Sequence, residues 1–314
     1  MIRLVVKRVL YTIPILLGVS VICFVLMSVL PGNPAAALLN DQMSEAEKQQ
    51  VLDETGYGDP LPVRYLTWLG GVLTGDMGYS DMRQRPVTQL LVDSMGNTMV
   101  LALVSAAVGV LGGLALGYLA GTRRGSLVDR VVSVISLAGL SVPSFFLAIV
   151  LLAWLAGELR LLPAGGAVLD QGPGPLLATL ALPVLTGGMV TTAITARVTR
   201  ASIVDTMSAD FVETLRAKGL TEWEVRRHVL RNALPPVLTT SGVQLGVLLG
   251  GAVIVETIFR WPGMGTLVFQ AISARDLVVI QGATLLIAVV FVLINLVVDI
   301  VQAAMDPRVR GAMT

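Results

Sequence analysis

Residues 278–301 read VVIQGATLLIAVVFVLINLVVDIV, a run in which the only charged side chain is Asp299. An α-helix rises 1.5 Å per residue, so roughly 20 apolar residues cross the hydrocarbon core of a bilayer, which is about 30 Å thick. This run is long enough and apolar enough to do so. It therefore predicts a helix that spans a membrane.

Five other stretches have the same length and apolar character. They are residues 9–30, 98–120, 131–156, 176–196 and 237–258. Of the 314 residues, 54% are hydrophobic and 14% are charged, whereas soluble domains carry about 25% charged residues. The sequence thus predicts an all-α membrane protein with six transmembrane helices and excludes an ordinary soluble domain. Pro183, Gly187 and Gly188 predict a bend in the fourth helix.

The first stretch follows Arg3, Lys7 and Arg8, as the apolar region of a secretory signal peptide does. The apolar region of a cleaved signal peptide is only about 7–15 residues long. Residues 1–30 are therefore expected to form an N-terminal segment and a first transmembrane helix that is retained.

Basic residues predict the orientation of the helices, because short loops rich in Lys and Arg stay in the cytoplasm. Of the 22 basic residues, 15 lie in the segments that would share one side of the membrane with both termini. Both termini are therefore expected in the cytoplasm. The 15 residues are Arg3, Lys7, Arg8, Arg123, Arg124, Arg130, Arg197, Arg200, Arg216, Lys218, Arg226, Arg227, Arg231, Arg308 and Arg310.

Residues 31–97 form the longest loop, which is expected on the outer side. It has nine acidic and four basic residues, and residues 44–54 predict an amphipathic helix within it. The predicted organisation is an N-terminal part at 1–30, an external loop at 31–97 and a five-helix core at 98–314. Residues 197–236 of that core form a cytoplasmic loop.

Glycine recurs every four residues on two of the predicted helices. The second helix has Gly109, Gly113, Gly117 and Gly121, and the fifth has Gly242, Gly246 and Gly250. Small-residue stripes let membrane helices approach closely, so both stripes predict helix contacts. A path for a transported molecule is the alternative.

The sequence holds little that could carry catalysis. His228 is the only histidine and Cys23 the only cysteine, so they cannot build a zinc site, and no HExxH or GxSxG motif occurs. A P-loop needs a Gly-Lys pair, but Lys7, Lys48 and Lys218 follow Val, Glu and Ala. We therefore expect no catalytic residue, metal or cofactor on this chain, and no enzyme activity. The net charge of +1 gives no support for a nucleic-acid partner.

Residues 197–236 are unusual for a membrane loop, because they are patterned like folded helices. Residues 203–217 and 222–234 each predict a helix, and Gly219 between them predicts a helix end. Such an elbow suits insertion into a groove on a cytosolic partner. The alternative is a solvated basic loop that binds anionic lipid.

The elbow contains ETLRAKGL at 213–220, followed by HVLRNALPP at 228–236. These strings resemble the coupling loop of bacterial ABC importer permeases of the dipeptide, oligopeptide and nickel transport family. Similar strings continue in order along the chain and match the first permease of such systems. They are LPGNP at 30–34, PLPVRYL at 60–66, GDMGYS at 75–80, SVPSFF at 141–146, LPAGG at 162–166, VETIF at 255–259, WPGMG at 261–265 and DPRVR at 306–310.

The resemblance implies the fold of a type I ABC importer permease and a division of labour among subunits. An extracytoplasmic substrate-binding protein would deliver di- or oligopeptides to a channel formed by this chain and a second homologous permease. Two ATP-binding subunits would hold ATP and Mg²⁺ and drive alternating access across the bacterial cytoplasmic membrane. This chain would have no ATPase site of its own.

The resemblance also implies roles for particular residues. The ATPase-coupling elbow would comprise Glu213, Arg216, Ala217, Lys218, Gly219 and Leu220, with Gly219 allowing the turn. The general coupling motif has Ala after the acidic residue, whereas Thr214 and Leu215 follow Glu213 here. We carry over no individual role to these two positions.

Three further expectations concern the transport path. The external loop at 31–97 would help to receive the binding protein. Trp261, Pro262 and Gly263 would form part of an external gate, or Trp261 would instead anchor the chain at the membrane interface. Gln244 and Asn295 are polar residues within predicted helices, and they either face the lumen or hold helices together.

Two alternatives remain open at this stage. Related systems share this scaffold with other cargoes, so a nickel chelate, haem or an oligosaccharide could replace the peptide. A protein of another class, a membrane scaffold whose basic loop holds lipid, would need no ATPase partner.

Overall fold

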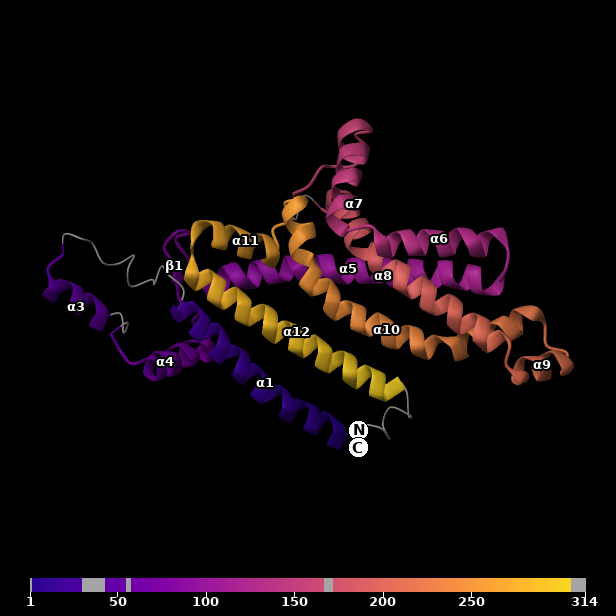
Figure 1. Ribbon diagram of the computed structural model, residues 1–314, viewed down its shortest axis with the longest axis horizontal. Helices are drawn as coiled ribbons and strands as arrows, with labels where there is room; N and C mark the ends of the chain where they lie inside the picture. The colour runs from indigo at the N-terminus through magenta and orange to yellow at the C-terminus, as the bar shows by residue number, and fades with distance from the viewer. Residues whose placement is uncertain (1, 30–42, 55–57, 167–171, 306–314) are drawn as a thin grey trace. The chain divides into compact units, whose positions relative to one another are not determined.

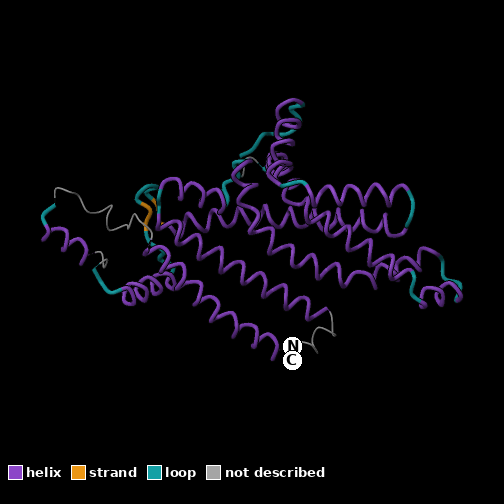
Figure 2. The backbone as a smooth tube through the Cα atoms, viewed as in Figure 1, coloured by secondary structure: helices purple, strands orange, loops and turns teal. Residues whose placement is uncertain are grey.

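The computed structural model describes residues 2–29, 43–54, 58–166 and 172–305, and nearly all of them are helical (Figure 1, Figure 2). This confirms the all-α prediction. The strings at 30–34 and 306–310, with Arg308 and Arg310, lie outside the described residues.

Helical segments make up most of the described residues. In chain order they are α1 (Ile2–Val29), α3 (Glu45–Glu54), α4 (Leu61–Thr74), α5 (Val87–Thr122), α6 (Leu127–Ser141), α7 (Ser144–Leu151), the π-helical η1 (Leu152–Glu158), α8 (Pro173–Met207), α9 (Asp210–Ala217), α10 (Glu222–Ile258), α11 (Met264–Ala274) and α12 (Leu277–Met305). Two short antiparallel strands, β1 (Tyr79–Ser80) and β2 (Arg85–Pro86), form a hairpin before α5.

Among the residues that the structure describes, four helices are long and apolar enough to cross a membrane: α1, α5, α8 and α12. Two further spans arise if each of two bent helix pairs counts as one, which gives up to six. The first pair is α6 with α7 and η1, and the second is the two parts of α10, on either side of a 56° bend between Leu248 and Gly250. The chain is thus a multi-pass membrane protein, as predicted.

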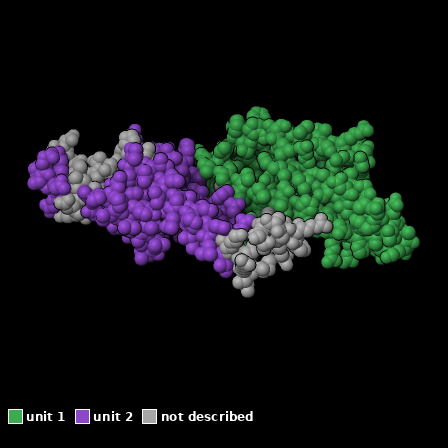
Figure 3. All heavy atoms as spheres, turned by 60° about the horizontal axis from the view of Figure 1, so that its bottom comes forward, with its two compact units in different colours: residues 1, 98–262, 297–314 green, residues 2–97, 263–296 purple. Residues whose placement is uncertain are grey.

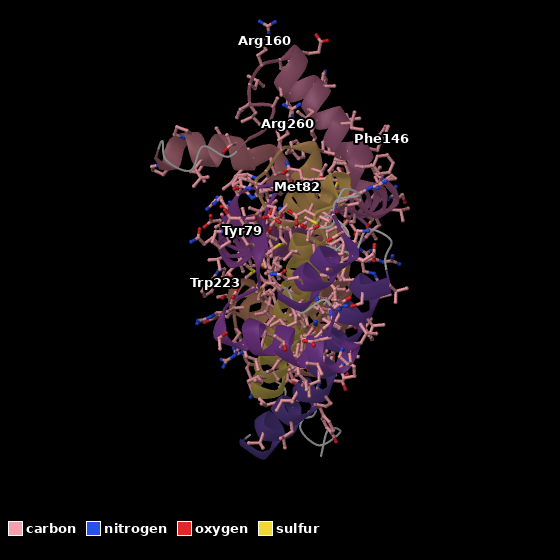
Figure 4. All side chains as sticks on the ribbon, turned by 90° about the vertical axis from the view of Figure 1, so that its left-hand side faces the viewer. Tyr79, Met82, Phe146, Arg160, Trp223 and Arg260 are labelled. Carbon is pink, nitrogen blue, oxygen red and sulfur yellow. The ribbon has the colours of Figure 1, made fainter. Side chains whose placement is uncertain are left out.

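The third predicted helix, at 131–156, is not straight. Instead, α6 ends at Ser141 and α7 begins at Ser144, and the two axes differ by 105°. Pro143 is the physical reason, because it lacks a backbone N–H and holds the preceding Val142 in an extended conformation. Arg160 stands near the tip of the arm that α7 and η1 form (Figure 4).

The fourth predicted helix keeps its continuity despite its proline. α8 runs without a break from Pro173 to Met207, with Pro183 inside it. Pro183 is itself buried, so neighbouring helices pack around the position where a backbone hydrogen bond is lost.

The chain forms two compact units (Figure 3). Unit 1 comprises residues 1, 98–262 and 297–314, and unit 2 comprises residues 2–97 and 263–296. In unit 2, the first turns of α5 pack with α11 and α12 around Leu91, Met264 and Val279. Ser80 of the hairpin donates a 2.5 Å hydrogen bond to Asp276, which precedes α12.

The glycine stripe on the second predicted helix makes the contact it predicts. In α5, a Cβ added to Gly109, Gly113 or Gly117 would lie 2.8 Å or less from α8, and the atoms met include the Cβ of Thr191, Thr195 and Thr199. α5 and α8 therefore touch backbone to backbone, as small-residue stripes allow. At Gly250 of the second predicted stripe, by contrast, the space that a Cβ would occupy is open within 4 Å.

Candidate functional site

The predicted cytoplasmic elbow is α9 with the adjoining ends of α8 and α10. The prediction of two separate short helices, at 203–217 and 222–234, is wrong in detail. Residue 203 belongs to α8, which continues to Met207, and α10 runs from Glu222 through Pro235 and Pro236 into the fifth span. α9 is thus one short helix held between two long ones, so its position is tied directly to the spans.

A small apolar core fixes α9 to these helices. Val212 of α9 is fully buried and packs with Ile203 of α8 and with Val225 and Val229 of α10. Tyr118 of α5 packs against the same core, so α9 and the turn between α5 and α6 lie at the same end of unit 1 (Figure 1). That turn holds Arg123 and Arg124, which agrees with the prediction that both segments face the same side.

Gly219 ends α9 in a Schellman motif. Its φ is +79°, its N–H donates to the carbonyl of Arg216 at 2.9 Å, and the N–H of Leu220 donates to the carbonyl of Leu215 at 3.3 Å. Leu215 and Leu220 both pack on the core beneath α9, which is the apolar contact that accompanies this motif. The positive φ of Gly219 therefore explains the turn that the sequence predicts at this residue.

The start of α10 completes the elbow. The Thr221 hydroxyl accepts from the N–H of Glu224, and the Glu224 carboxylate accepts from the N–H of Thr221 at 2.8 Å, which is a capping box. Arg216 of α9 donates to Glu222 of α10 at 2.8 Å, and this hydrogen bond raises the pKa of Arg216 above its usual value. These bonds set the angle between α9 and α10.

The elbow presents a polar face to solvent. Five of the six predicted coupling residues are exposed, whereas Leu220 is half-buried and anchors the turn from below. The exposed ones are Glu213, Arg216, Ala217, Lys218 and Gly219.

Trp223 was missed by the sequence prediction. Its side chain, labelled in Figure 4, is 70% exposed. The guanidinium carbon of Arg227 lies 5.9 Å from the centroid of its ring. A tryptophan in a basic, solvent-facing helix was the available signal, because large exposed aromatic side chains are enriched where proteins bind one another.

An ion pair braces the same end of unit 1. Arg200 of α8 donates to both carboxylate oxygens of Asp129 near the start of α6, one of these bonds being 2.9 Å long. Asp129 also accepts from the N–H of Gly125, which closes the turn after α5. Because the carboxylate is buried, this bidentate pair fixes α6 on α8.

A cavity of about 130 Å³ lies among α5, α7, α8 and α10 in unit 1. Its wall is mostly apolar, and none of its described lining residues is charged. Gln244 and the hydroxyl-bearing residues Ser105, Ser144, Thr186 and Thr191 supply its polar atoms. The Ser105 hydroxyl is buried and has no hydrogen-bond partner among the described residues.

Gln244 and Asn295, the two predicted lumen residues, have different surroundings. Gln244 lines this cavity. Asn295 of α12 donates to the carbonyl of Phe291 one turn earlier on its own helix. Neither the cavity nor the elbow holds a group of side chains that could bind a metal ion. No three His, Cys, Asp or Glu side chains gather anywhere in the part of the chain that the structure describes.

The family described as "Binding-protein-dependent transport system inner membrane component" matches residues 113–311, and its N-terminal counterpart matches residues 1–102. The chain belongs to this family.

Relatives of the permease match it over almost their whole length. It is 37% identical over 317 residues to a Brucella suis protein named as a peptide permease, and 38% identical over 311 residues to GsiC, a glutathione transport system permease protein of Escherichia coli. Both alignments cover 99% of this chain and 99% of the relative.

Solved structures confirm the fold of the permease. The MetNI methionine ABC transporter, in an inward-facing conformation, contains a chain with a TM-score of 0.57 and 20% identity, covering 69% of this chain and 97% of its own. A chain of an amino acid ABC transporter with histidines has a TM-score of 0.52 and 18% identity, covering 70% of this chain and 94% of its own.

The residues predicted to form an external gate lie at the end of α10 and the start of α11. Trp261 is fully buried with Phe259 and Leu182, so its alternative role as an anchor at the membrane interface is wrong. Pro262 is exposed, and Gly263 precedes α11 as its N-cap.

Two buried contacts hold the Trp261 segment of the permease. Thr98 of α5 donates to the carboxylate of Glu256 at 2.6 Å, and Glu256 is completely buried. Gly166 donates to the carbonyl of Phe259 at 2.9 Å, and a Cβ on Gly165 would lie 2.2 Å from that oxygen. The strings at 162–166 and 255–259, which are far apart in sequence, thus form one packed corner.

Proposed function

We propose that this permease is one channel-forming subunit of an ATP-driven importer that carries di- or oligopeptides across the bacterial cytoplasmic membrane. The observation that carries the proposal is its full-length similarity to permeases named for peptide and glutathione transport. Glutathione is itself a tripeptide, so both names point to the same chemical class of cargo.

The energy for transport would come from two separate ATP-binding subunits, because the chain has no P-loop lysine. They would hold ATP and Mg²⁺ and contact the exposed face of α9. An extracytoplasmic binding protein would deliver the cargo, and a second homologous permease would form the other half of the channel.

The geometry of the elbow supports a mechanical role. A push on α9 cannot be absorbed at its C-terminal end, since the Schellman motif, the capping box and the Arg216–Glu222 pair all fix the turn between α9 and α10. The core around Val212 then passes the displacement to α8 and α10. These two helices enter the bundle, so movement of the elbow would change the transport path between inward-open and outward-open arrangements.

The cavity beside Gln244 supports a path for uncharged polar groups. Peptide backbones carry one N–H donor and one C=O acceptor per residue. Gln244 can donate and accept, and the hydroxyl of Ser105 can do both. A wall with such groups and no described charge could contact peptide backbones of many sequences without selecting for charged side chains.

The first test is purification of the complex through a tag on this chain in a mild detergent, with mass spectrometry of the companions. We expect a second permease and two ATP-binding subunits. The purified complex, placed in vesicles with its binding protein, should take up radiolabelled di- or tripeptide only with ATP.

Two outcomes would overturn the proposal. A chain that purifies alone and without ATPase activity, in detergents that preserve other importers, would indicate a membrane scaffold. The second outcome is a complete complex that hydrolyses ATP, yet neither takes up any peptide tested nor binds one in competition experiments. That result would rule out peptides as the cargo and leave the importer architecture intact.

A further inference from the structure

Helix α4, in the loop expected outside the membrane, packs against the transmembrane part of α1. The hydroxyls of Tyr65 and Ser20 are 2.8 Å apart. The ring of Phe24 lies 5.5 Å from the rings of both Tyr65 and Trp68. On α1, Ser20 and Phe24 are buried while most of the neighbouring described side chains are exposed, so α4 covers one stripe of α1.

The position of this contact along α1 is deep. The apolar span runs from Arg8 to Val29. At 1.5 Å per residue, Ser20 lies about 18 Å from Arg8 and about 13.5 Å from Val29. A hydrocarbon core is about 30 Å thick, so Ser20 lies close to the level of the bilayer centre. A helix that is hydrogen-bonded to Ser20 therefore cannot lie wholly in the water outside the membrane.

The composition of α4 fits this depth. Arg64 is its only charged residue, and the apolar side chains of Leu61, Val63, Leu66 and Leu73 are about half exposed or more. The neighbouring α3 is a contrast within the same loop, because five of its ten residues are charged: Glu45, Glu47, Lys48, Asp53 and Glu54. A helix in water has the composition of α3 rather than that of α4.

Several backbone groups at the two ends of α4 are also paired within the chain, which suits a helix in lipid because water is absent there. At its start, Pro62 has no N–H to satisfy, and the N–H groups of Val63 and Arg64 both donate to the carbonyl of Pro60. At its end, the N–H of Asp76 donates to the carbonyl of Gly71, and the Thr74 hydroxyl donates to the same carbonyl.

We propose that α4 is a re-entrant helix whose exposed apolar face contacts lipid acyl chains in the outer leaflet. Its aromatic side faces α1, and the charged hairpin that follows returns the chain to water before α5 begins. The external loop would then be tethered in the membrane rather than free above it. This proposal rests on the orientation of the chain in the membrane and not on the cargo.

Spin labels test whether lipid, water or another protein contacts the exposed apolar face of α4. The complete complex is placed in phospholipid nanodiscs, with Cys23→Ala and one new cysteine, Leu66→Cys or Leu73→Cys, carrying a nitroxide. Collisions with oxygen, which concentrates in lipid, are compared with collisions with a water-soluble nickel chelate. Matched controls are Lys48→Cys on α3 and Leu17→Cys, which is exposed on α1 at similar depth to Ser20.

We expect the oxygen to nickel-chelate ratio at Leu66 and Leu73 to match Leu17 and to exceed that at Lys48 several-fold. A ratio equal to that at Lys48 would place α4 in water, and exclusion of both reagents would mean that a protein partner covers it. Either result overturns the proposal.

A second measurement needs no cysteine, in case the Cys23→Ala background does not assemble. Leu73→Trp is made in the wild-type chain, and the added fluorescence is followed in nanodiscs of brominated phospholipid. We expect several-fold quenching relative to unbrominated lipid. Unchanged fluorescence would overturn the proposal. Since ATPase activity and uptake are measured separately, failure here leaves the proposed function intact, and the reverse also holds.

Discussion

At the scale of single residues, Gly219 has the clearest conformational role. Its φ of +79° is unfavourable for a side chain, and the space around it is open, so only the backbone opposes substitution. Gly219→Ala should therefore cost about 1–2 kcal/mol of elbow stability and reduce ATP-driven uptake. Gly219→Asn is the matched control, because Asn tolerates this conformation better. Equal uptake by Ala and Asn variants would contradict this account of the turn.

The ion pair between Asp129 and Arg200 gives a second prediction at this scale. Asp129→Ala leaves the Arg200 guanidinium without its buried partner, which should destabilise unit 1 by about 1–3 kcal/mol. Glu222→Ala removes an ion pair of similar geometry that is solvent-exposed on both sides. Thermal unfolding of the purified complex should show a clear loss for Asp129→Ala and a small one for Glu222→Ala. A reversed order would show that the pair at Asp129 contributes little.

At the scale of helices, the contact between α5 and α8 depends on individual glycines. A Cβ at Gly113 would lie 2.5 Å from the Cβ of Thr195, whereas a Cβ at Gly112 would lie 3.7 Å from its nearest neighbour in Thr192. Gly113→Ala should therefore cost about 1–3 kcal/mol through overpacking, while Gly112→Ala should be nearly neutral. The thermal midpoint of the complex measures both. Similar midpoints for the two variants would mean that α8 moves to accommodate the methyl group.

The helices also show what the sequence could and could not predict. Hydrophobic runs located the spans, and the four-residue spacing of glycine predicted the face of α5 that meets α8. The third span was predicted as one helix because hydropathy averages over Pro143, although its missing N–H was visible in the sequence. The second half of the elbow was predicted as a short helix at 222–234, yet α10 continues through Pro235 and Pro236 into the fifth span.

Contacts between distant residues could not be predicted from spacing. The cavity beside Gln244 is formed by four helices, and the burial of Trp261 depends on Leu182, about 80 residues earlier in the chain. Hydropathy gives a tryptophan near a helix end the same score whether it faces lipid or a protein core. The coupling residues themselves were predicted through a resemblance, and the structure adds how they are held: Leu220 points to the core while Lys218 is exposed.

At the scale of the whole molecule, the exposed charges of the two loops should have separable effects. Glu213 lies on the exposed face of α9, in the elbow proposed to contact an ATPase subunit, and Lys48 lies on α3 in the external loop. Glu213→Lys reverses a charge in the proposed contact, so the new lysine would face a like charge or have no partner on the ATPase subunit. Like charges placed together across an interface cost up to several kcal/mol. We expect ATP-driven uptake to fall about tenfold, corresponding to about 1.4 kcal/mol of lost coupling, while the chain still enters the membrane.

Lys48→Glu is the matched charge reversal on the other loop, and it should leave both ATPase copurification and the basal ATPase rate unchanged. The rate of ATP hydrolysis and the rate of uptake are measured on the same preparation, because uncoupling lowers uptake per ATP hydrolysed whereas loss of assembly lowers both rates together. Wild-type uptake by Glu213→Lys would remove α9 from the proposed contact. Loss of the ATPase subunits from Lys48→Glu would invert the orientation of the chain and, with it, the side from which α4 enters the bilayer.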